Sequence, residues 1–240
     1  MPAILYTIGM GPGDPELLTL KAARLIASAP VVAFFAKRGR TGHARTIAGN
    51  LVPATAEQLR FEYPYTTEIE LADPRYAEGM SEFYSNCARQ IAARLDAGHN
   101  VALLCEGDPF LYGSAMYLFD RLQNHRLETI PGVAGMSGCW SRAGLPFTHG
   151  DDVLSVLPAT LDEDSLVTGL GQCHAAVIMK LGRNLPKVRR ALHRAGLTDR
   201  AVYVERGTME NERIFRMRDL DTDVAPYFAL ILIPGRQASR

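Results

Sequence analysis

The sequence predicts an α/β protein with two domains, each built on a sheet of about five strands. In the first half of the 240-residue chain, short apolar runs alternate with amphipathic segments, which is typical of a parallel sheet with crossover helices. In the second half only short connections separate the last strand-like runs, which permits antiparallel pairing. We therefore expect residues 1–132 to form a domain with a parallel sheet, and residues 133–240 a domain with a mixed sheet.

Buried apolar runs predict the strands of the first half, and apolar residues at helical spacing predict the helices between them. Asp14 is expected to cap the first helix, with Pro15 in its first turn, and Pro30 to end it. Gly98 is well placed to stop the longest helix. The predicted strands are residues 5–8, 31–35, 59–62, 101–104 and 127–130, and the later helices are residues 41–50, 80–97 and 114–122.

The second half is predicted to hold five further strands and a helix over residues 185–195, ended by Gly196. The acidic run at residues 162–164 is interpreted as a solvated helix start. The strands are expected at residues 154–157, 175–179, 201–204, 213–217 and 227–233.

Composition excludes several kinds of partner. The formal net charge is zero, so no global field attracts nucleic acid or a membrane surface, and no run of 18 apolar residues is present. The four cysteines are far apart and form no CxxC pair, which fits a reducing cytoplasm. The six histidines lack metal-ligand spacing, so we expect no metal site. These features indicate a cytoplasmic protein with a small-molecule ligand.

Two glycine-rich loops follow predicted strands, at residues 9–14 and 106–113. Because small ligands bind at the carboxyl ends of strands in open α/β sheets, the loops suggest two lips of one crevice. Each loop alone also fits a plain turn. The first loop departs from a dinucleotide fingerprint, since Asp14 takes the third glycine position and Pro12 removes an N–H. A basic end of the second strand suits NADP, so an NADP-dependent oxidoreductase is an alternative.

A basic cluster follows the second strand and supplies four formal positive charges beside the predicted crevice. Arginine binds carboxylates in bidentate fashion, so such a loop suits a ligand with several carboxylates, although charge runs are also common in solvated loops. The cluster consists of Lys37, Arg38, Arg40 and Arg45.

Together these motifs resemble the tetrapyrrole methylases, which use S-adenosylmethionine in sirohaem and cobalamin synthesis. The resemblance covers nearly the whole chain. It rests on residues 11–19 (Gly-Pro-Gly-Asp-Pro-Glu-Leu-Leu-Thr), 106–113 (Glu-Gly-Asp-Pro-Phe-Leu-Tyr-Gly), 130–133 (Ile-Pro-Gly-Val), 144–146 (Gly-Leu-Pro) and a strand end containing Met179.

Within the family, the chain is most similar to the branch that methylates C20 of precorrin-2, giving precorrin-3A in cobalamin biosynthesis. Residues 36–37, 177–188, 203–212 and 225–232 carry that similarity. The related branch of the anaerobic route acts on the cobalt-loaded substrate, and the pattern leaves the two open. The resemblance also implies a homodimer. A non-catalytic carrier of cofactor or tetrapyrrole is the third hypothesis.

The resemblance implies that S-adenosylmethionine, which becomes S-adenosylhomocysteine, binds in a cleft between the two domains. Ala134 and Gly135 occupy positions where many relatives carry Thr or Ser and a small residue. The basic cluster is expected to bind substrate carboxylates, and Glu106, Asp108 or Tyr112 to assist proton loss. The implied cofactor residues are Pro12, Glu106, Gly107, Asp108 and Leu111 from the first domain, Ala134 and Gly135, and Met179, Gly207 and Thr208 on the adenine side.

Overall fold

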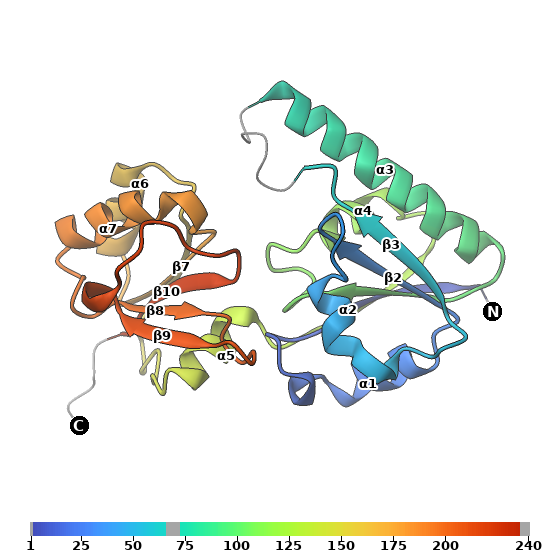
Figure 1. Cartoon of the computed structure of the whole chain (residues 1–240), viewed down its shortest axis with the longest axis horizontal. Helices are drawn as coiled ribbons and strands as arrows, with labels where there is room; N and C mark the ends of the chain where they lie inside the picture. The colour runs from blue at the N-terminus through green and yellow to red at the C-terminus, as the bar shows by residue number, and fades with distance from the viewer. Residues whose placement is uncertain (1, 66–72, 236–240) are drawn as a thin grey trace. The chain divides into compact units, whose positions relative to one another are not determined.

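The computed structural model describes residues 2–65 and 73–235 of the chain. It divides into two compact units, Met1–Gly135 and Met136–Arg240, whereas the sequence placed the boundary after Gly132. Each unit is an α/β domain with one five-stranded sheet (Figure 1). The predicted fold class, with a parallel and a mixed sheet, is thus confirmed.

The sheet of the N-terminal domain is parallel throughout, with strand order β3-β2-β4-β1-β5. The three central strands are almost wholly buried, which explains their continuous apolar sequences. The strands are β1 (Ile4–Gly9), β2 (Val31–Ala36), β3 (Glu57–Glu62), β4 (Val101–Cys105) and β5 (Arg126–Ile130).

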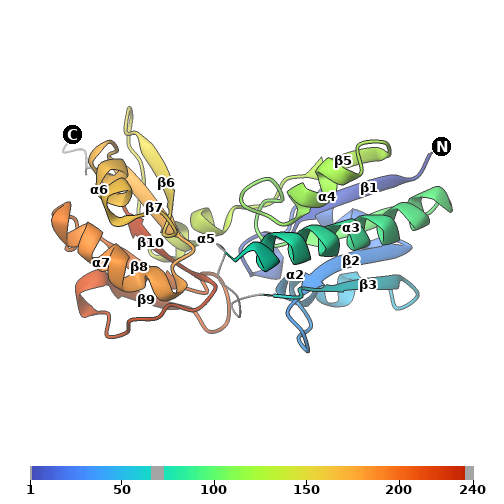
Figure 2. The same ribbon diagram turned by 90° about the horizontal axis from the view of Figure 1, so that it is seen from above.

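Helices cover both faces of this sheet (Figure 2). Alternate strand residues such as Ala33 and Leu103 pack against helices α3 and α4, whereas Phe34 and Leu104 pack against α1 and α2. This alternation follows from the two-residue period of a strand. The helices are α1 (Leu20–Ala27), α2 (His43–Ala48), α3 (Pro74–Asp96) and α4 (Ala115–Arg121), with 3-10 turns η1 (Pro15–Leu17) and η2 (Gly49–Leu51).

Two helix starts differ from the sequence prediction. Asp14 caps the short turn η1, where it accepts the N–H of Glu16, and Thr19 caps α1 separately. Helix α3 begins at Pro74 rather than at residue 80, with Asp73 as its N-cap. Gly79 interrupts the helical pattern of the sequence there, since glycine is a poor helix former. In the structure, Gly79 lies against the ring of Tyr65.

The C-terminal sheet is mixed, with strand order β6-β7-β10-β8-β9. Strands β6 and β7 are parallel, and β10 runs antiparallel to both β7 and β8. Strand β10 therefore inserts between β7 and β8 instead of pairing with β9. The strands are β6 (Leu154–Pro158), β7 (Ala175–Met179), β8 (Val202–Glu205), β9 (Arg213–Arg216) and β10 (Ala229–Ile233).

Helices α6 (Glu163–Gly171) and α7 (Leu185–Arg194) cover one face of this sheet, and α5 (Gly135–Arg142) lies on the other. The sequence prediction missed α5, because its two glycines and two serines give it low helix propensity. Packing of Cys139 and Trp140 against strand residues stabilises it. Short turns η3 (Gly182–Asn184) and η4 (Met217–Asp219) complete the domain. Within the described residues, no helix is both long enough and apolar enough to cross a membrane.

Candidate active site

The loops after β1 and β4 lie at the topological switch point of the N-terminal sheet. These strands are neighbours, but the connection from β1 leads to β2 on one side, and the connection from β4 leads to β5 on the other. Loops that diverge in this way open a crevice at the carboxyl ends of the strands. The two glycine-rich loops of the sequence therefore meet where an open α/β sheet binds its ligand.

Backbone hydrogen bonds join these two loops directly. Gly11 and Gly107 form an antiparallel bridge in which Gly107 N donates to Gly11 O at 2.8 Å and Gly11 N donates to Gly107 O at 3.3 Å. Met10 N donates to Cys105 O at 2.8 Å. A Cβ on Gly9 would lie 2.5 Å from Gly132 N, so the loop after β5 packs equally closely. Glycine is needed here because any side chain would separate the three loops.

Asp108 fixes the β4 loop to the β5 loop. Its Oδ1 accepts the N–H of Phe110 at 2.9 Å, and its Oδ2 accepts the N–H of Gly132 at 3.2 Å. Both carboxylate oxygens are thus engaged by backbone donors. This arrangement favours a positioning role for Asp108 over proton transfer.

The same hydrogen bonds argue against a dinucleotide site. The N–H groups of Met10 and Gly11 point to carbonyls of the β4 loop and cannot cradle a phosphate. The first α-helix begins only at Leu20, so this loop does not lead directly into an α-helix as a dinucleotide fingerprint requires. Pro12 is buried beside it. An NADP-dependent oxidoreductase is therefore disfavoured.

Glu106 lies directly after β4, next to the start of α2. Its Oε1 accepts the N–H of Ala44 at 3.4 Å. The residue keeps part of its surface exposed, but protein atoms around the carboxylate remove enough water to raise its pKa. Backbone N–H groups and the charge of His43 oppose this desolvation only in part.

Tyr112 and Leu111 continue the same loop. Tyr112 is 43% exposed and has φ of 57°, a left-handed conformation that is uncommon for a non-glycine residue. Leu111 is half-buried, and its N–H donates to Asp108 O at 3.2 Å. Strained backbone of this kind is concentrated at functional sites.

Ala134 and Gly135 follow Gly132 and are half-buried. A Cβ on Gly107 would lie 3.5 Å from Gly135 N, so the β4 loop runs past this segment. A Cβ on Gly135 itself would meet nothing within 4 Å. The small residues leave open space beside the backbone at this point.

Three members of the basic cluster sit on an exposed turn after β2. Lys37, Arg38 and Arg40 are all exposed, and Arg40 N donates to Lys37 O at 2.9 Å to close the turn. Arg45 differs, because its guanidinium donates to Gln58 Oε1 at 2.9 Å and to Gly49 O at 3.0 Å. The structure thus separates Arg45 from the other three cations.

The predicted cofactor residues of the C-terminal domain share one edge of its sheet. Strands β7 and β8 both run antiparallel to β10, so Met179 and the segment after Glu205 lie at the same end. Lys180, Arg206 and Thr208 all have positive φ, at 60°, 48° and 70°. Left-handed non-glycine residues are concentrated at functional sites, so this edge is a candidate for one.

Gly207 and Thr208 are held by contacts that the sequence did not reveal. A Cβ on Gly207 would lie 2.5 Å from the Sγ of Cys139 in α5. Thr208 N donates to Glu212 Oε2 at 2.7 Å, and Arg142 Nε donates to the same carboxylate at 2.9 and 3.0 Å. The Arg142 guanidinium holds the pKa of Glu212 below its usual range. Glu212 lies in the segment 203–212 that carries the family resemblance, but its pairing with Arg142 could not be read from the sequence, because 70 residues separate them.

Cationic groups and backbone, rather than metal ligands, characterise both strand edges. Across residues 2–65 and 73–235, no group of three or more His, Cys, Asp or Glu is arranged to hold a metal ion. The residues that the sequence singled out do cluster on each domain: the β1, β4 and β5 loops on one, and the β7 and β8 ends on the other. Glycine-lined strand ends without a phosphate cradle suit a ligand that is held mainly by backbone groups.

Comparison with known proteins defines the class first. A crystal structure of uroporphyrin-III C-methyl transferase from Thermus thermophilus, complexed with S-adenyl homocysteine, superposes with a TM-score of 0.69. The two sequences are 25% identical, and the superposition covers 97% of this chain and 92% of the Thermus chain. The fold is therefore that of a two-domain α/β methyltransferase.

The family follows from the sequence comparisons. Residues 4–220 match the model of the Tetrapyrrole (Corrin/Porphyrin) Methylases, and the chain belongs to this family. A precorrin-2 C(20)-methyltransferase of Sinorhizobium sp is 52% identical over 96% of this chain and 95% of its own. A cobalt-precorrin-2 C(20)-methyltransferase of Salmonella typhimurium is 27% identical over 95% of both. The predicted family and enzyme class are confirmed, as is S-adenosylmethionine as the family's cofactor.

Proposed function

We propose that the protein transfers a methyl group from S-adenosylmethionine to C20 of precorrin-2, giving precorrin-3A in cobalamin biosynthesis. The observation that carries this proposal is the 52% identity, over nearly all of both chains, to a protein named precorrin-2 C(20)-methyltransferase. The relative named for the cobalt-loaded substrate is only 27% identical. We therefore take metal-free precorrin-2 as the substrate.

The cofactor is proposed to bind at the glycine-lined strand ends. S-adenosylmethionine brings an already activated methyl group on its sulfonium, so the protein need not supply a nucleophile. Pro12, Gly107, Asp108 and Leu111 are proposed to hold it from the β1 and β4 loops, with Ala134 and Gly135 beside them. Met179, Gly207 and Thr208 are proposed to contact its adenine. The open space beside Gly135 and the half-buried small residues support a ligand held by backbone groups.

The exposed basic turn is proposed to recognise the substrate. A tetrapyrrole of this class carries several carboxylate side chains, and guanidinium groups bind carboxylates with two parallel hydrogen bonds. Lys37, Arg38 and Arg40 are exposed after β2, at the carboxyl edge of the sheet. We leave Arg45 out of this site because its guanidinium is already bonded to Gln58 and Gly49.

Methyl transfer to a meso carbon requires that carbon to lose a proton. Among the three acidic candidates, we propose Glu106 as the acceptor. Desolvation raises its pKa, which brings its basicity closer to what a general base needs near neutral pH. Both carboxylate oxygens of Asp108 already accept backbone N–H groups. Tyr112 is proposed to line the site rather than to accept the proton.

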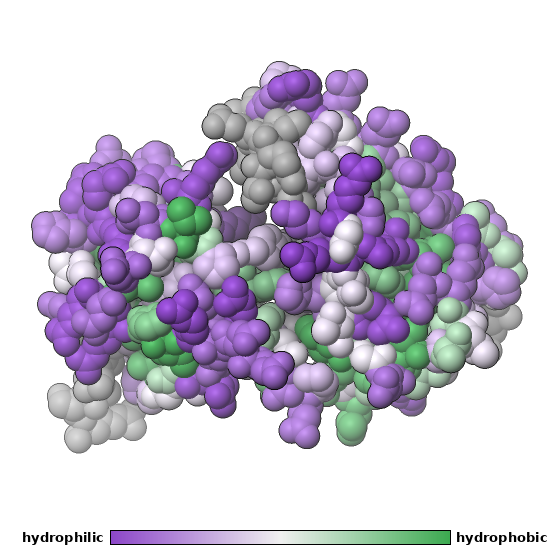
Figure 3. All heavy atoms as spheres, in the orientation of Figure 1, coloured by the Kyte–Doolittle hydropathy of each residue, from purple (hydrophilic) through white to green (hydrophobic). Residues whose placement is uncertain are grey.

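We further propose a cytoplasmic homodimer. The four cysteines are all free thiols, which suits a reducing compartment. Phe110, Tyr112 and Tyr117 are 46%, 43% and 50% exposed within one short stretch, and a second copy would cover such side chains. On the face drawn in Figure 3, hydrophilic side chains predominate, and apolar ones are scattered between them. Light scattering after size exclusion checks the dimer, and a single-chain mass would contradict it.

The central test is incubation of the protein with precorrin-2 and S-adenosylmethionine that carries an isotopically labelled methyl group. We expect one label per tetrapyrrole, at C20. A parallel reaction with the cobalt-loaded substrate decides the metal question, since faster turnover of that form would reverse our assignment. Absence of transfer to either substrate would reject the proposed activity. A protein that binds both ligands without turnover would instead be a carrier.

A further inference from the structure

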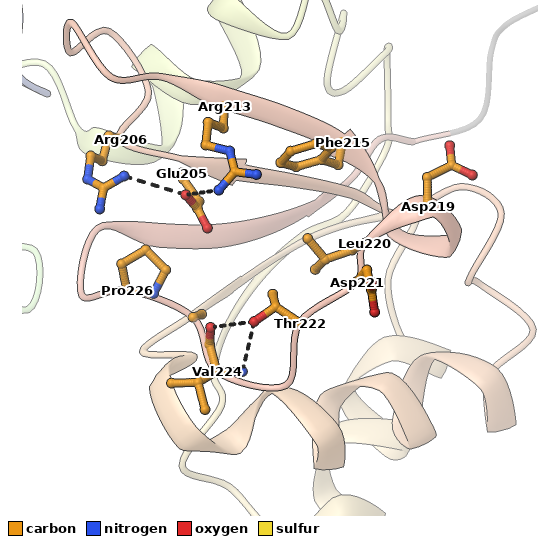
Figure 4. Close-up of a pocket in the computed structure, with 11 residues that line it drawn as sticks. Glu205, Arg206, Arg213, Phe215, Asp219, Leu220, Asp221, Thr222, Val224 and Pro226 are labelled. Atoms are coloured by element: carbon orange, nitrogen blue, oxygen red, sulfur yellow. Dashed lines mark hydrogen bonds and ion pairs between the residues drawn. The ribbon is translucent and has the colours of Figure 1, made fainter.

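The C-terminal domain contains a pocket of about 610 Å³ beside the edge that carries Gly207 and Thr208. It opens between the β8–β9 hairpin and the loop that precedes β10 (Figure 4). Arg206 and Arg213 lie around Glu205 at one end, and Phe215 forms part of a wall. The volume is in the range of small-molecule sites, which run from roughly 300 to 1,000 Å³.

Glu205 places a buried negative charge at the centre of the arginine end. The residue is only 5% exposed, and its Oε1 accepts the hydroxyl of Tyr203 at 2.8 Å. Its Oε2 lies 3.5 Å from Arg206 Nη1 and 3.7 Å from Arg213 Nη1. Burial and the bond to Glu205 raise the pKa of Tyr203, so its hydroxyl remains a donor. Buried carboxylates of this kind normally require such partners.

The two arginines are not neutralised by this one carboxylate. Two positive charges share one negative charge, which leaves a net charge of about +1 at this end. Both ion pairs are longer than the 2.7–2.9 Å of a charge-assisted hydrogen bond, so the guanidinium donors retain capacity. One further carboxylate would balance the cluster.

Apart from Glu205, the acidic groups that line the pocket lie at its other end. Asp219 and Asp221 line the end opposite Arg206, as Figure 4 shows. Asp219 lies 3.7 Å from the neighbouring Arg218. The pocket is therefore polarised, and an anionic group belongs at its arginine end. The Arg213 guanidinium lies over the ring of Phe215, 4.9 Å from its centre, and this contact helps to orient the arginine at that end.

The arginine end is continuous with the predicted cofactor edge. Arg206 directly precedes Gly207 and Thr208, and its N–H donates to Phe228 O at 2.7 Å, which fixes the backbone. Its φ of 48° is a left-handed conformation that this contact helps to maintain. Thr208, with φ of 70°, is also left-handed, so the segment that bears the arginine and the predicted cofactor residues holds two such residues.

We propose that this pocket binds a carboxylate side chain of the tetrapyrrole through Arg206 and Arg213, with Glu205 as the positioning residue that holds the two guanidinium groups. This inference rests on the proposed function for the identity of the substrate. It adds a substrate-recognition site on the C-terminal domain, distinct in its residues from the basic turn after β2.

The test compares Arg206→Gln and Arg213→Gln with a control, Arg216→Gln. The control removes an exposed cation of β9, the strand that also carries Arg213, and Arg216 does not line the pocket. Each pocket variant is expected to raise the KM for precorrin-2 at least about tenfold, because a hydrogen bond to a charged group is lost. The kcat and the Kd of S-adenosylhomocysteine are expected to stay constant. Arg→Lys at either position keeps the charge and should recover part of the KM. Thermal melting of each variant checks that it folds.

A binding arm separates this inference from the proposed activity. Uroporphyrin III and its methyl ester, in which the carboxylates are neutral, are titrated against the wild type and the variants by fluorescence. We expect the wild type to bind the acid more tightly than the ester. We expect the pocket variants to bind the acid more weakly than the wild type does. The binding measurement does not depend on methylation of precorrin-2. If precorrin-2 is not methylated but binding behaves as expected, the proposed activity is rejected and the pocket assignment is kept. Unchanged affinity and KM in folded variants would overturn the pocket assignment, as would an equal loss of S-adenosylhomocysteine affinity.

Discussion

The Oδ2 atom of Asp108 accepts the backbone N–H of Gly132 at 3.2 Å, although 24 residues separate them in the chain. This bond ties the loop after β4 to the loop after β5, on opposite sides of β1 in the sheet. The Gly11–Gly107 bridge ties the β4 loop to the β1 loop. Three glycine-rich loops thus form one rigid backbone surface at the carboxyl edge.

The first prediction concerns this clamp. Asp108→Ala should weaken S-adenosylhomocysteine binding about tenfold and tetrapyrrole binding much less. Loss of the acceptor should also lower the free energy of unfolding by about 1–3 kcal/mol, because a partly buried N–H is left without its partner. Calorimetric titration and denaturant unfolding measure the two effects. Asp162→Ala removes a comparable backbone acceptor from the start of α6 and should spare the cofactor. Equal weakening of both ligands would contradict the placement of the loop.

The second prediction distinguishes a glycine that is needed for close packing of the loops, Gly9, from one that leaves room for the ligand, Gly135. Gly9→Ala brings a Cβ within 2.8 Å of Gly107 O and should unfold the protein at a lower temperature. Gly135→Ala meets no atom within 4 Å, so it should melt like the wild type yet bind S-adenosylhomocysteine several-fold less tightly. Gly171→Ala, equally open and remote from the strand ends, serves as the control. Normal cofactor affinity in Gly135→Ala would remove that residue from the site.

The third prediction is a pH dependence from Glu106. As a general base it acts only when ionised, so kcat should fall as pH drops through its raised pKa. Glu106→Gln should lower kcat about a hundredfold or more and abolish that limb of the profile. Glu16→Gln, an exposed residue of the same domain, should leave the profile unchanged.

The Glu106→Gln substitution should lower kcat but raise the thermal stability of the protein. Because the folded-state pKa of Glu106 is raised, its contribution to stability is present at low pH and is lost as pH rises through that pKa. Glu106→Gln should therefore melt at a higher temperature than the wild type near neutral pH. A variant with full kcat and an unaltered profile would exclude Glu106 as the base.

A fourth prediction follows from the Arg142–Glu212–Thr208 contacts. Glu212→Gln removes the charged acceptor of Thr208 N and should weaken S-adenosylhomocysteine binding several-fold. Since the pKa of Glu212 is lowered, its stabilisation is present above its unfolded pKa and is lost as pH falls through the folded one. The melting difference from the wild type should thus shrink in acid. Glu163→Gln, whose pKa is also lowered by arginines, should leave cofactor binding intact.

The fifth prediction concerns the basic turn. Combined Arg38→Ala and Arg40→Ala substitutions should raise the KM for precorrin-2 without changing the affinity for S-adenosylhomocysteine. Arg45→Ala should instead reduce stability, because Gln58 and Gly49 lose their donor. Steady-state kinetics and thermal melts distinguish these outcomes, with the exposed pair Arg24→Ala and Arg89→Ala as the charge-matched control. An unchanged KM would show that the turn does not touch the substrate.

The sequence by itself determined the family and the two-sheet architecture, and it located the strand ends where we propose the site. Apolar periodicity and turn residues are local properties, so β2 and β7 could be located closely from them. Helix α5 could not, because its own residues favour other conformations and only packing, including Cys139 against Gly207, stabilises it.

Only the tertiary structure decided what individual polar side chains do. The motif containing Asp108 pointed to the site, but its bond to Gly132 depends on β1 lying between β4 and β5. The same is true of Arg45. The sequence grouped it with three other cations, but in the structure its guanidinium donates to Gln58. Glu205 and Glu212 lie in the segment 203–212 that carries the family resemblance, but nothing in that segment indicated the partner of either carboxylate. Hydrogen bonds join residues that are distant in the chain, so their partners are fixed by strand order and register rather than by local pattern.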